Sequence, residues 1–201
     1  MMETKDTLAK IYLISGKARH GKDTFSAYLK ECYESHGKKV IVTQLSKYIK
    51  YYAREMTGWN LTEEDKPREL LQVLGTGIIR ERLGKEDLFI KRMIDDIEIF
   101  SCFYDAIIIS DVRLKKEIDD LRVKYPSLVA INIFRPDFDN GLTEEQKMHK
   151  TEIDLDDYDK FDVKVINTTL DGLKEEAEKY TQIMKGRYKN YENYYWCRCK
   201  G

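Results

Sequence analysis

The 201-residue sequence lacks any excess of charge of one sign, because 35 basic residues stand against 36 acidic ones and the formal net charge is −1. A protein that coats nucleic acid non-specifically usually has a strongly basic surface, so nucleic acid is not an expected partner. An anionic disordered protein is also excluded, since 42% of the residues are hydrophobic and 11% are aromatic. The length suits one α/β domain, or a domain with an insertion.

Long hydrophobic runs and cysteine clusters are missing as well. The first apolar run, Ile11–Ile14, is far shorter than the roughly 7–15 apolar residues of a secretory signal or the ~20 of a membrane helix. We therefore expect a soluble, cytoplasmic protein with no membrane partner. Cys32 and Cys102 stand alone in apolar segments, and Cys197 with Cys199 has no second pair nearby to complete a zinc site. A disulfide framework is equally disfavoured.

Short apolar runs alternate with amphipathic stretches along the chain. Strands are expected at 10–15, 40–43, 105–110, 128–134 and 162–166. Helices are expected at 22–35, 45–56, 62–83, 85–103, 115–124 and 170–184. Strands separated by helices predict βαβ units and therefore an α/β fold around a parallel sheet.

The chain is expected to form one domain over 1–201, because no repeat, low-complexity linker or second hydrophobic core divides it. Its strands and their helices fill three core stretches, 10–57, 104–134 and 160–185. A helical region, 45–103, lies between the second and third strands. Residues 135–159 are polar, acidic and poor in large apolar side chains, which is typical of a surface excursion or a mobile lid.

The strongest local signal is the segment from Gly16 to Lys22, GKARHGK, which follows a predicted strand and opens a predicted helix. It matches the phosphate-binding pattern G-x-x-x-x-G-K. Glycines let the backbone approach phosphates closely, and backbone N–H groups with the helix N-terminus face the anion. The residues expected to bind the phosphates of ATP are Gly16, Lys17, Ala18, Arg19, His20, Gly21, Lys22, Asp23 and Thr24. Within this loop, we expect the His20 side chain to face solvent.

The position after the lysine departs from the motif. Ser or Thr usually stands there as a ligand of Mg²⁺, whereas this chain has Asp23 followed by Thr24. A carboxylate suits a hard cation, so Asp23 is a candidate Mg²⁺ ligand, directly or through water. Asp111 is the second candidate, because the carboxyl end of a parallel strand faces the ligand crevice. The alternative for Asp111 is a cap on the helix that follows.

Several arginines could hold phosphate groups, since a guanidinium binds phosphate in bidentate fashion. Arg113 lies just after Asp111, and Arg135 opens the polar excursion. Arg80 follows Gly75 and Gly77, two glycines that break helical propensity and indicate a close approach to the backbone. Taken singly, each arginine could instead be a solvated helix residue. The predicted catalytic residues are Lys22, Asp111, Arg113 and Arg135.

Taken in order, these segments resemble the phage-type deoxynucleoside monophosphate kinases over roughly residues 10–180. The resemblance begins with S-G-x-x-x-x-G-K-D-T, which ends at Thr24. It continues with R-x-L-L-Q-x-x-G-T-x-x-x-R at Arg68–Arg80 and with D-V-R-x-x-x-E at Asp111–Glu117. The remaining matches are Arg135, His149, Glu152, Leu155, Asp162 and Asn167.

The resemblance implies a three-layer α/β/α P-loop NTPase fold with a five-stranded parallel sheet, a helical acceptor-binding region and a lid. It implies transfer of the γ-phosphoryl group of ATP to a nucleoside or deoxynucleoside monophosphate, with Mg²⁺ as cofactor. Arg68 and Arg80 would hold the acceptor phosphate, and Gln72 would lie near the acceptor. Asn167 would lie near the donor adenine.

Two alternatives stay open. The same ordered motifs also resemble the animal-type phosphomevalonate kinases, whose Leu-Ser-x-x-x-Lys pattern is matched by Leu45, Ser46 and Lys50. That resemblance implies a non-nucleotide phosphorylated acceptor held by Ser46 and Lys50. The other alternative is a nucleotide- or RNA-binding protein without transferase activity, suggested by basic and aromatic residues in the tail, 187–201. The simpler interpretation is that this tail packs on its own domain or on a second subunit, forming a homodimer.

Overall fold

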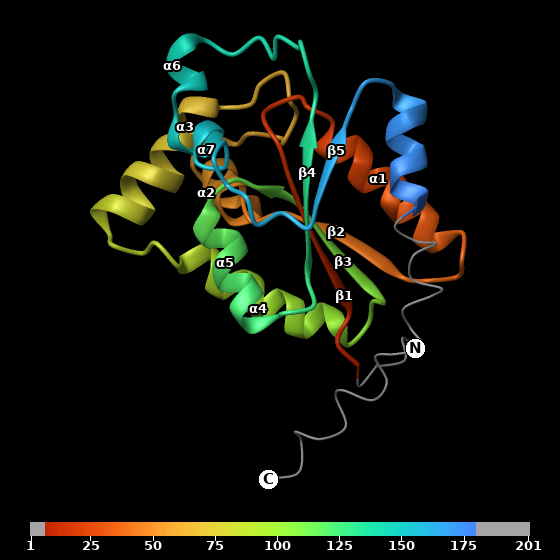
Figure 1. Ribbon diagram of the computed structural model, residues 1–201. Coiled ribbons are helices and arrows are strands. Elements are labelled where there is room, and N and C mark those ends of the chain that lie inside the picture. The colour runs from red at the N-terminus through yellow and green to blue at the C-terminus, as the bar shows by residue number, and fades with distance from the viewer. Residues whose placement is uncertain (1–6, 180–201) are drawn as a thin grey trace.

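The computed structural model of the protein describes residues 7–179. Its strands are β1 Lys10–Ser15, β2 Val40–Thr43, β3 Ala106–Val112, β4 Val129–Phe134 and β5 Val163–Ile166. They form one parallel sheet in the order β2-β3-β1-β4-β5 (Figure 1). The predicted five-stranded parallel sheet is therefore confirmed. The tail, 187–201, and the predicted end of the last helix lie outside the described residues.

Helices cover both faces of this sheet. They are α1 Lys22–Glu34, α2 Lys47–Thr57, α3 Arg68–Gln72, η1 Val73–Arg82, α4 Leu88–Ser101, α5 Lys115–Lys124, α6 Glu144–Lys147 and α7 Lys150–Ile153, with residues 170–179 also helical. In Figure 1, α1 and the helix at 170–179 lie on one side of the strands, and α2, α4 and α5 lie on the other. The result is the three-layer α/β/α arrangement.

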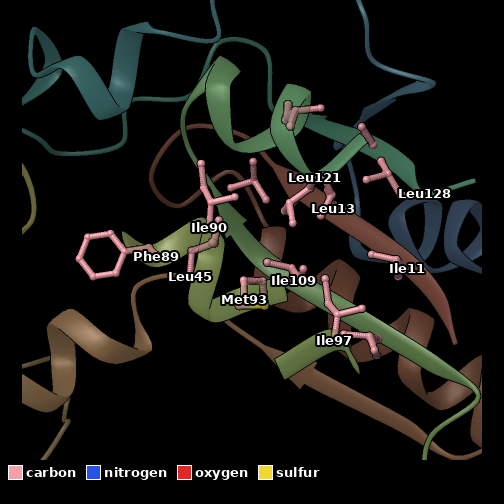
Figure 2. Close-up of a cluster of buried hydrophobic side chains, with 14 of the residues drawn as sticks. Ile11, Leu13, Leu45, Phe89, Ile90, Met93, Ile97, Ile109, Leu121 and Leu128 are labelled. Atoms are coloured by element: carbon pink, nitrogen blue, oxygen red, sulfur yellow. The ribbon is translucent and has the colours of Figure 1, made fainter. Parts of the chain in front are cut away.

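The central strands β1 and β3 are almost entirely apolar because both of their faces are buried. In β1, Ile11 and Leu13 belong to one hydrophobic cluster, which also contains Met93 and Ile97 of α4. The alternate residues Tyr12 and Ile14 belong to a second cluster, which contains side chains of α1 and of the 170–179 helix. Figure 2 shows the first cluster between the strands and α4. Packing on both faces fixes the register of β1 and hence the position of the loop that follows it.

The helix predicted over 62–83 is wrong in its first turn and in its type. Residues 62–67 form a loop, and α3 begins only at Arg68, directly after Pro67. Proline has a fixed φ and no N–H group, and it disfavours helical backbone in the residue before it. From Val73 the chain continues as η1, a π-helix. Helical spacing of apolar residues does not distinguish a π-helix from an α-helix over so short a stretch.

Gly75 marks the place where α2 packs on η1. A Cβ atom at this glycine would lie 2.8 Å from Cδ1 of Ile49 in α2. The close approach that the glycines indicated is therefore made by Ile49, a residue of the same chain. This packing holds η1, and with it Arg80, against the rest of the helical layer.

The polar excursion, which we call the lid segment (135–159), contains two short helices, α6 and α7. His149 precedes α7, and its side chain accepts a hydrogen bond from the Thr151 N–H group. Asp154 accepts the N–H group of Lys115 at 2.7 Å, which ties the segment to the start of α5. Within residues 7–179, no helix combines the length and apolar character needed to cross a membrane.

Candidate active site

The loop between β1 and α1, which we call the phosphate loop (16–22), depends on two glycines. Gly16 has φ 144° and Gly21 has φ 99°. A Cβ atom would lie 2.3 Å from the backbone oxygen of Ile133 at Gly16, and 2.5 Å from Nδ2 of Asn167 at Gly21. Both positions therefore exclude a side chain by backbone conformation and by space. The loop is tightly enclosed by β4 and by the residue that follows β5.

Asn167 and His20 form the buried support of this loop. The Asn167 amide donates to the His20 carbonyl oxygen at 2.9 Å. The His20 ring is only 5% exposed, and its Nδ1 accepts the Arg135 N–H group at 3.1 Å. Burial lowers the pKa of His20, and the Lys22 cation lowers it further. The expectation that His20 faces solvent is wrong, because Phe134 and Phe138 pack edge-on around the ring.

Lys22 begins α1 and is almost completely buried. Its ammonium donates to the Lys17 carbonyl oxygen at 2.8 Å. Burial, and then the nearby Arg113 cation, lower the pKa of Lys22 to about 7. Three carboxylates act in the opposite direction on this pKa: those of Glu152, Asp23 and Asp111. A buried lysine with so low a pKa is poised to gain a proton when an anion arrives.

Arg113 reaches the phosphate loop from the turn after β3. Its Nη1 donates to the Gly16 carbonyl oxygen at 3.2 Å and to Oε1 of Glu152 at 2.7 Å. The turn itself is held by Glu117, whose Oε2 accepts the N–H groups of Arg113 and Leu114 at 2.8 and 3.0 Å. The structure thus brings Lys22 and Arg113, which are far apart in sequence, to the same loop.

Asp111 lies at the carboxyl end of β3 and engages the start of α2. Its Oδ1 accepts the Leu45 N–H group at 2.7 Å, and its Oδ2 accepts the Ser46 N–H group at 3.0 Å and the Ser46 hydroxyl. The alternative of a cap on the helix after Asp111 is wrong, because α5 begins after Leu114. Asp111 instead fixes the segment that carries Lys50, whose ammonium donates to the Gln44 side chain.

The two arginines expected at the acceptor phosphate make separate ion pairs. Arg80 pairs with the buried Glu117 at 3.0 Å, and its guanidinium lies over the Phe89 ring, 5.1 Å from the centroid. Burial raises the pKa of Glu117 to about 7. Arg68 pairs with the exposed Glu63 in the loop before α3, and Gln72 is half-buried at the end of α3. Arg80 therefore lies behind the turn that carries Arg113, whereas Arg68 lies farther out.

A cavity of about 450 Å³ runs along α2, in the helical region that the family resemblance assigns to the acceptor, and we name it the acceptor cavity after that expectation. It is lined by Gln44, Lys47, Lys50, Tyr51, Arg54, Trp59, Leu61, Glu63 and Lys66. Lys47, Lys50 and Arg54 follow the spacing of one helical face. Lys47 pairs with Asp96 and Lys66 with Glu63, but within residues 7–179 neither Lys50 nor Arg54 has a carboxylate in ion-pair distance. Lys47 was not singled out in the sequence, and Arg54 was considered only as one of several arginines between the second and third strands, although the helical spacing of both residues was visible.

A second cavity, of about 510 Å³, lies between the phosphate loop and the lid segment, and we name it the donor cavity after the expectation that this loop binds ATP. Its lining residues are Lys17, His20, Phe134, Arg135, Asp137, Phe138, Asp139, Asn140, Lys147 and Glu152. The Arg135 guanidinium lies 3.9 Å from the centroid of the Phe138 ring. Arg19 donates to the Asn140 carbonyl oxygen at 2.9 Å, which closes one side of the cavity.

The two carboxylates near the phosphate loop, those of Asp23 and Asp111, are oxygen ligands of the kind that suits Mg²⁺. Asp23 is exposed at the start of α1, while both oxygens of Asp111 accept hydrogen bonds. Both carboxylates raise the pKa values of Lys22 and Lys50, so both lie near these two lysines. The described residues contain no cluster of three or more His, Cys, Asp or Glu side chains suited to a metal. Mg²⁺ is commonly held by only one or two carboxylates together with substrate phosphates.

Comparisons with known proteins concern the fold. No protein-family model matches the chain, and no curated protein is found as a relative. TT1252 from Thermus thermophilus is a similar solved structure, with a TM-score of 0.55 and 16% identity over 89% of this chain and 98% of that one. APS kinase CysC from Mycobacterium tuberculosis, in complex with AMPPNP and APS, has a TM-score of 0.51 and 10% identity over 88% of this chain and 98% of that one. The chain has the P-loop NTPase fold.

Proposed function

We propose that the protein transfers the γ-phosphoryl group of ATP to the phosphate of a nucleoside or deoxynucleoside monophosphate, giving the diphosphate. The observation that carries this proposal is the meeting of Lys22 and Arg113 at the phosphate loop, beside Asp111 and Lys50. Two separate cavities flank these residues, one along the lid segment and lined by Lys17, and one along α2 and lined by Lys50. That arrangement suits two phosphorylated ligands whose phosphates must be brought together.

The proposed reaction needs charge neutralisation more than proton transfer. The second pKa of a phosphate ester is about 6, so the acceptor is largely a dianion at neutral pH and requires no general base. An acceptor oxygen attacks the γ-phosphorus, the bond from that phosphorus to the β–γ bridging oxygen breaks, and ADP leaves with the electron pair. Lys22 and Arg113 offset the negative charge of the transferred group. Arg135 would act from the lid side, beside the donor nucleoside.

Asp23 and Asp111 would hold Mg²⁺, Asp111 through water because its oxygens already accept hydrogen bonds. When bound, the ion would neutralise phosphate charge. Asn167 would act on the donor side by holding the backbone of His20 in place. Ser46 and Lys50 would face the acceptor phosphate from the start of α2, and Arg80 would support the turn that carries Arg113 through Glu117.

A second candidate acceptor is a phosphorylated metabolite that is not a nucleotide. The acceptor cavity has four cationic side chains but only Glu63 as a carboxylate, which favours an acceptor with negative charge beyond a single phosphate. In addition, Phe89, the aromatic ring beside Arg80, is 1% exposed and cannot stack on a base. Tyr51, which is 57% exposed in the same cavity, remains as a surface for a nucleotide base.

The test is ADP release measured across a panel of acceptors with ATP and Mg²⁺. The panel contains nucleoside and deoxynucleoside monophosphates, sugar phosphates and phosphorylated carboxylic acids. We expect acceptor-dependent turnover by the wild type, none by Lys22→Met, and wild-type turnover by Lys30→Met, which changes an exposed lysine on the same helix. If no acceptor in the panel supports ADP release, the proposed function is wrong. The preferred class of acceptor decides between the two candidates.

A further inference from the structure

A carboxylate of the lid segment occupies two hydrogen-bond donors of the proposed donor site. Oε2 of Glu152 accepts the N–H group of Ala18 in the phosphate loop at 3.0 Å. Its Oε1 accepts Nη1 of Arg113 at 2.7 Å. The Glu152 side chain is only 11% exposed, so both contacts are shielded from water. Contacts of this kind, from a backbone N–H group and a guanidinium to an anion, are the ones expected for a phosphate oxygen.

The charge of Glu152 also acts on Lys22. Among the carboxylates that raise the pKa of Lys22, Glu152 has a larger effect than Asp23 or Asp111. Glu152 therefore lies closer, in electrostatic terms, to the phosphate-binding lysine than either candidate metal ligand. Neither the loop motif nor the predicted roles of Lys22 and Arg113 requires a carboxylate at this place.

Neighbouring acidic residues keep Glu152 in position. Asp156 pairs with Lys17 of the phosphate loop at 2.9 Å. Asp157 pairs with Lys115 at 2.7 Å, at the start of α5. The acidic stretch that includes and follows α7 therefore spans the phosphate loop and the turn that carries Arg113. Exposed ion pairs of this kind contribute little each, so the stretch can be displaced by a ligand with stronger contacts.

We propose that Glu152 is a specificity-determining residue of the donor site, because its carboxylate takes the place of the terminal phosphate at Ala18 and Arg113. This inference rests on the proposed function, in which Arg113 contacts the transferred γ-phosphoryl group. A nucleoside triphosphate must displace the Glu152 carboxylate in order to bind. ADP, which ends at the β-phosphate, leaves the carboxylate in place. Glu152 thus selectively weakens binding of the triphosphate.

The test is direct binding of two nucleotides, measured by calorimetry with Mg²⁺. ADP and the non-hydrolysable triphosphate AMPPNP are titrated into the wild type, Glu152→Gln and Glu145→Gln. Glu145 is an exposed carboxylate in the same lid segment, so its substitution makes the same change of charge away from the loop. We expect Glu152→Gln to bind AMPPNP about tenfold more tightly, since it removes a competing charge-assisted contact. The affinity for ADP should change less than about twofold, and Glu145→Gln should match the wild type.

Other outcomes overturn the inference. Unchanged or weaker binding of AMPPNP by Glu152→Gln would mean that the carboxylate only positions Arg113. Equal tightening for ADP and AMPPNP would mean a general charge effect without selection for the terminal phosphate. Binding of neither nucleotide, even to the wild type, would overturn the proposed function as well. Should Glu152→Gln not fold, Glu152→Asp serves instead, because its shorter side chain cannot keep both contacts. It should then show a smaller gain for AMPPNP alone.

Discussion

The donor side and the acceptor side of the proposed site differ in the atoms that close the space beside their glycines. On the donor side, the space beside Gly16 is closed by a backbone oxygen, and the space beside Gly21 by a buried amide. On the acceptor side, the space beside Gly75 is closed by a methyl group of Ile49, and the cavity is lined by long cationic side chains. The Ile133 backbone cannot move without displacing β4, and the Asn167 side chain is held by its buried hydrogen bond to the His20 carbonyl oxygen, whereas an aliphatic side chain such as that of Ile49 can change rotamer. The donor side is therefore fixed for one kind of ligand, and a few substitutions could adapt the acceptor side to another.

The largest effect is expected from Gly16→Ala, which tests whether the donor side is rigid. The added Cβ would meet the Ile133 oxygen at 2.3 Å, in a backbone conformation that L-residues rarely adopt. We expect the free energy of unfolding to fall by about 3 kcal/mol and ADP binding to be lost. Urea denaturation and calorimetry check both effects. A loss below about 1 kcal/mol would show that the donor wall yields as readily as the acceptor wall.

Lys22→Met tests whether the buried Lys22 cation on the donor side destabilises the folded protein. The pKa of Lys22 is about 7 in the folded chain, whereas the ordinary lysine value of 10.5 applies to the unfolded chain. Between pH 7 and pH 10.5 the unfolded chain therefore holds a proton at Lys22 that the folded chain lacks. The free energy of unfolding of the wild type therefore rises with pH between these values, and the buried cation lowers it most below pH 7.

At pH 7 we expect Lys22→Met to be more stable than the wild type by about 2 kcal/mol. The difference should shrink toward pH 10, as urea denaturation at several pH values would show. Lys30→Met, at an exposed lysine paired with Glu34, should stay within about 0.5 kcal/mol of the wild type at every pH. A variant that is less stable than the wild type at pH 7 would contradict the low pKa of Lys22.

Arg54→Ala tests whether the acceptor side binds its ligand independently of the donor side. Arg54 lines the acceptor cavity one helical turn beyond Lys50, away from the phosphate loop. We expect the KM for the acceptor to rise about tenfold, with kcat and the KM for ATP nearly unchanged, because only acceptor binding is lost. Arg82→Ala, at an exposed arginine that lines neither cavity, is the matched control. An equal effect on the KM for ATP would show that the two sides are not separate.

The smallest effect is expected from Gly75→Ala. Here the one close contact of the added Cβ is the Cδ1 methyl group of Ile49, at 2.8 Å, while Arg80 Nη1 lies at an ordinary 3.7 Å, and alanine favours helical backbone. We expect the steric cost of the contact with Ile49 and the gain from the helix propensity of alanine to nearly cancel, so that the free energy of unfolding changes by less than about 1 kcal/mol. Gly77→Ala, with no atom within 4 Å of its Cβ position, should raise stability by about 0.5 kcal/mol. A large loss at Gly75 would mean that the acceptor wall is as rigid as the donor wall.

The parts of the molecule that could be predicted from the sequence depend on local patterns. The strands were predicted almost to the residue, because a strand buried on both faces must be apolar throughout, as in Ala106–Ile109. The phosphate loop was recognisable because its glycines and lysine lie within one short segment. The loop at 62–67 was missed although Pro67 is a local signal against a helix before it. The π-helix was missed because its apolar spacing resembles that of an α-helix over so short a stretch.

Contacts between distant segments could not be predicted in this way. His20 lies in the loop motif, yet its burial depends on Phe134 at the end of β4 and on Phe138 in the lid segment. Glu152 was noted only as a position in the lid, because its contact with Ala18 spans more than half of the chain. The cationic face of α2 had visible helical spacing, but the solvated face of any surface helix has the same spacing. Only the adjacent cavity distinguishes the two.

The position of β1 within the sheet has a consequence for how the chain folds. β1 pairs with β3 and β4, which are about a hundred residues away in sequence, and the loop after it is supported by Asn167. Pairings over such separations form slowly, because a long loop must close before they are gained. During synthesis the motif leaves the ribosome well before residue 167, which completes its support. Nucleotide binding should therefore be among the last properties that a folding chain acquires.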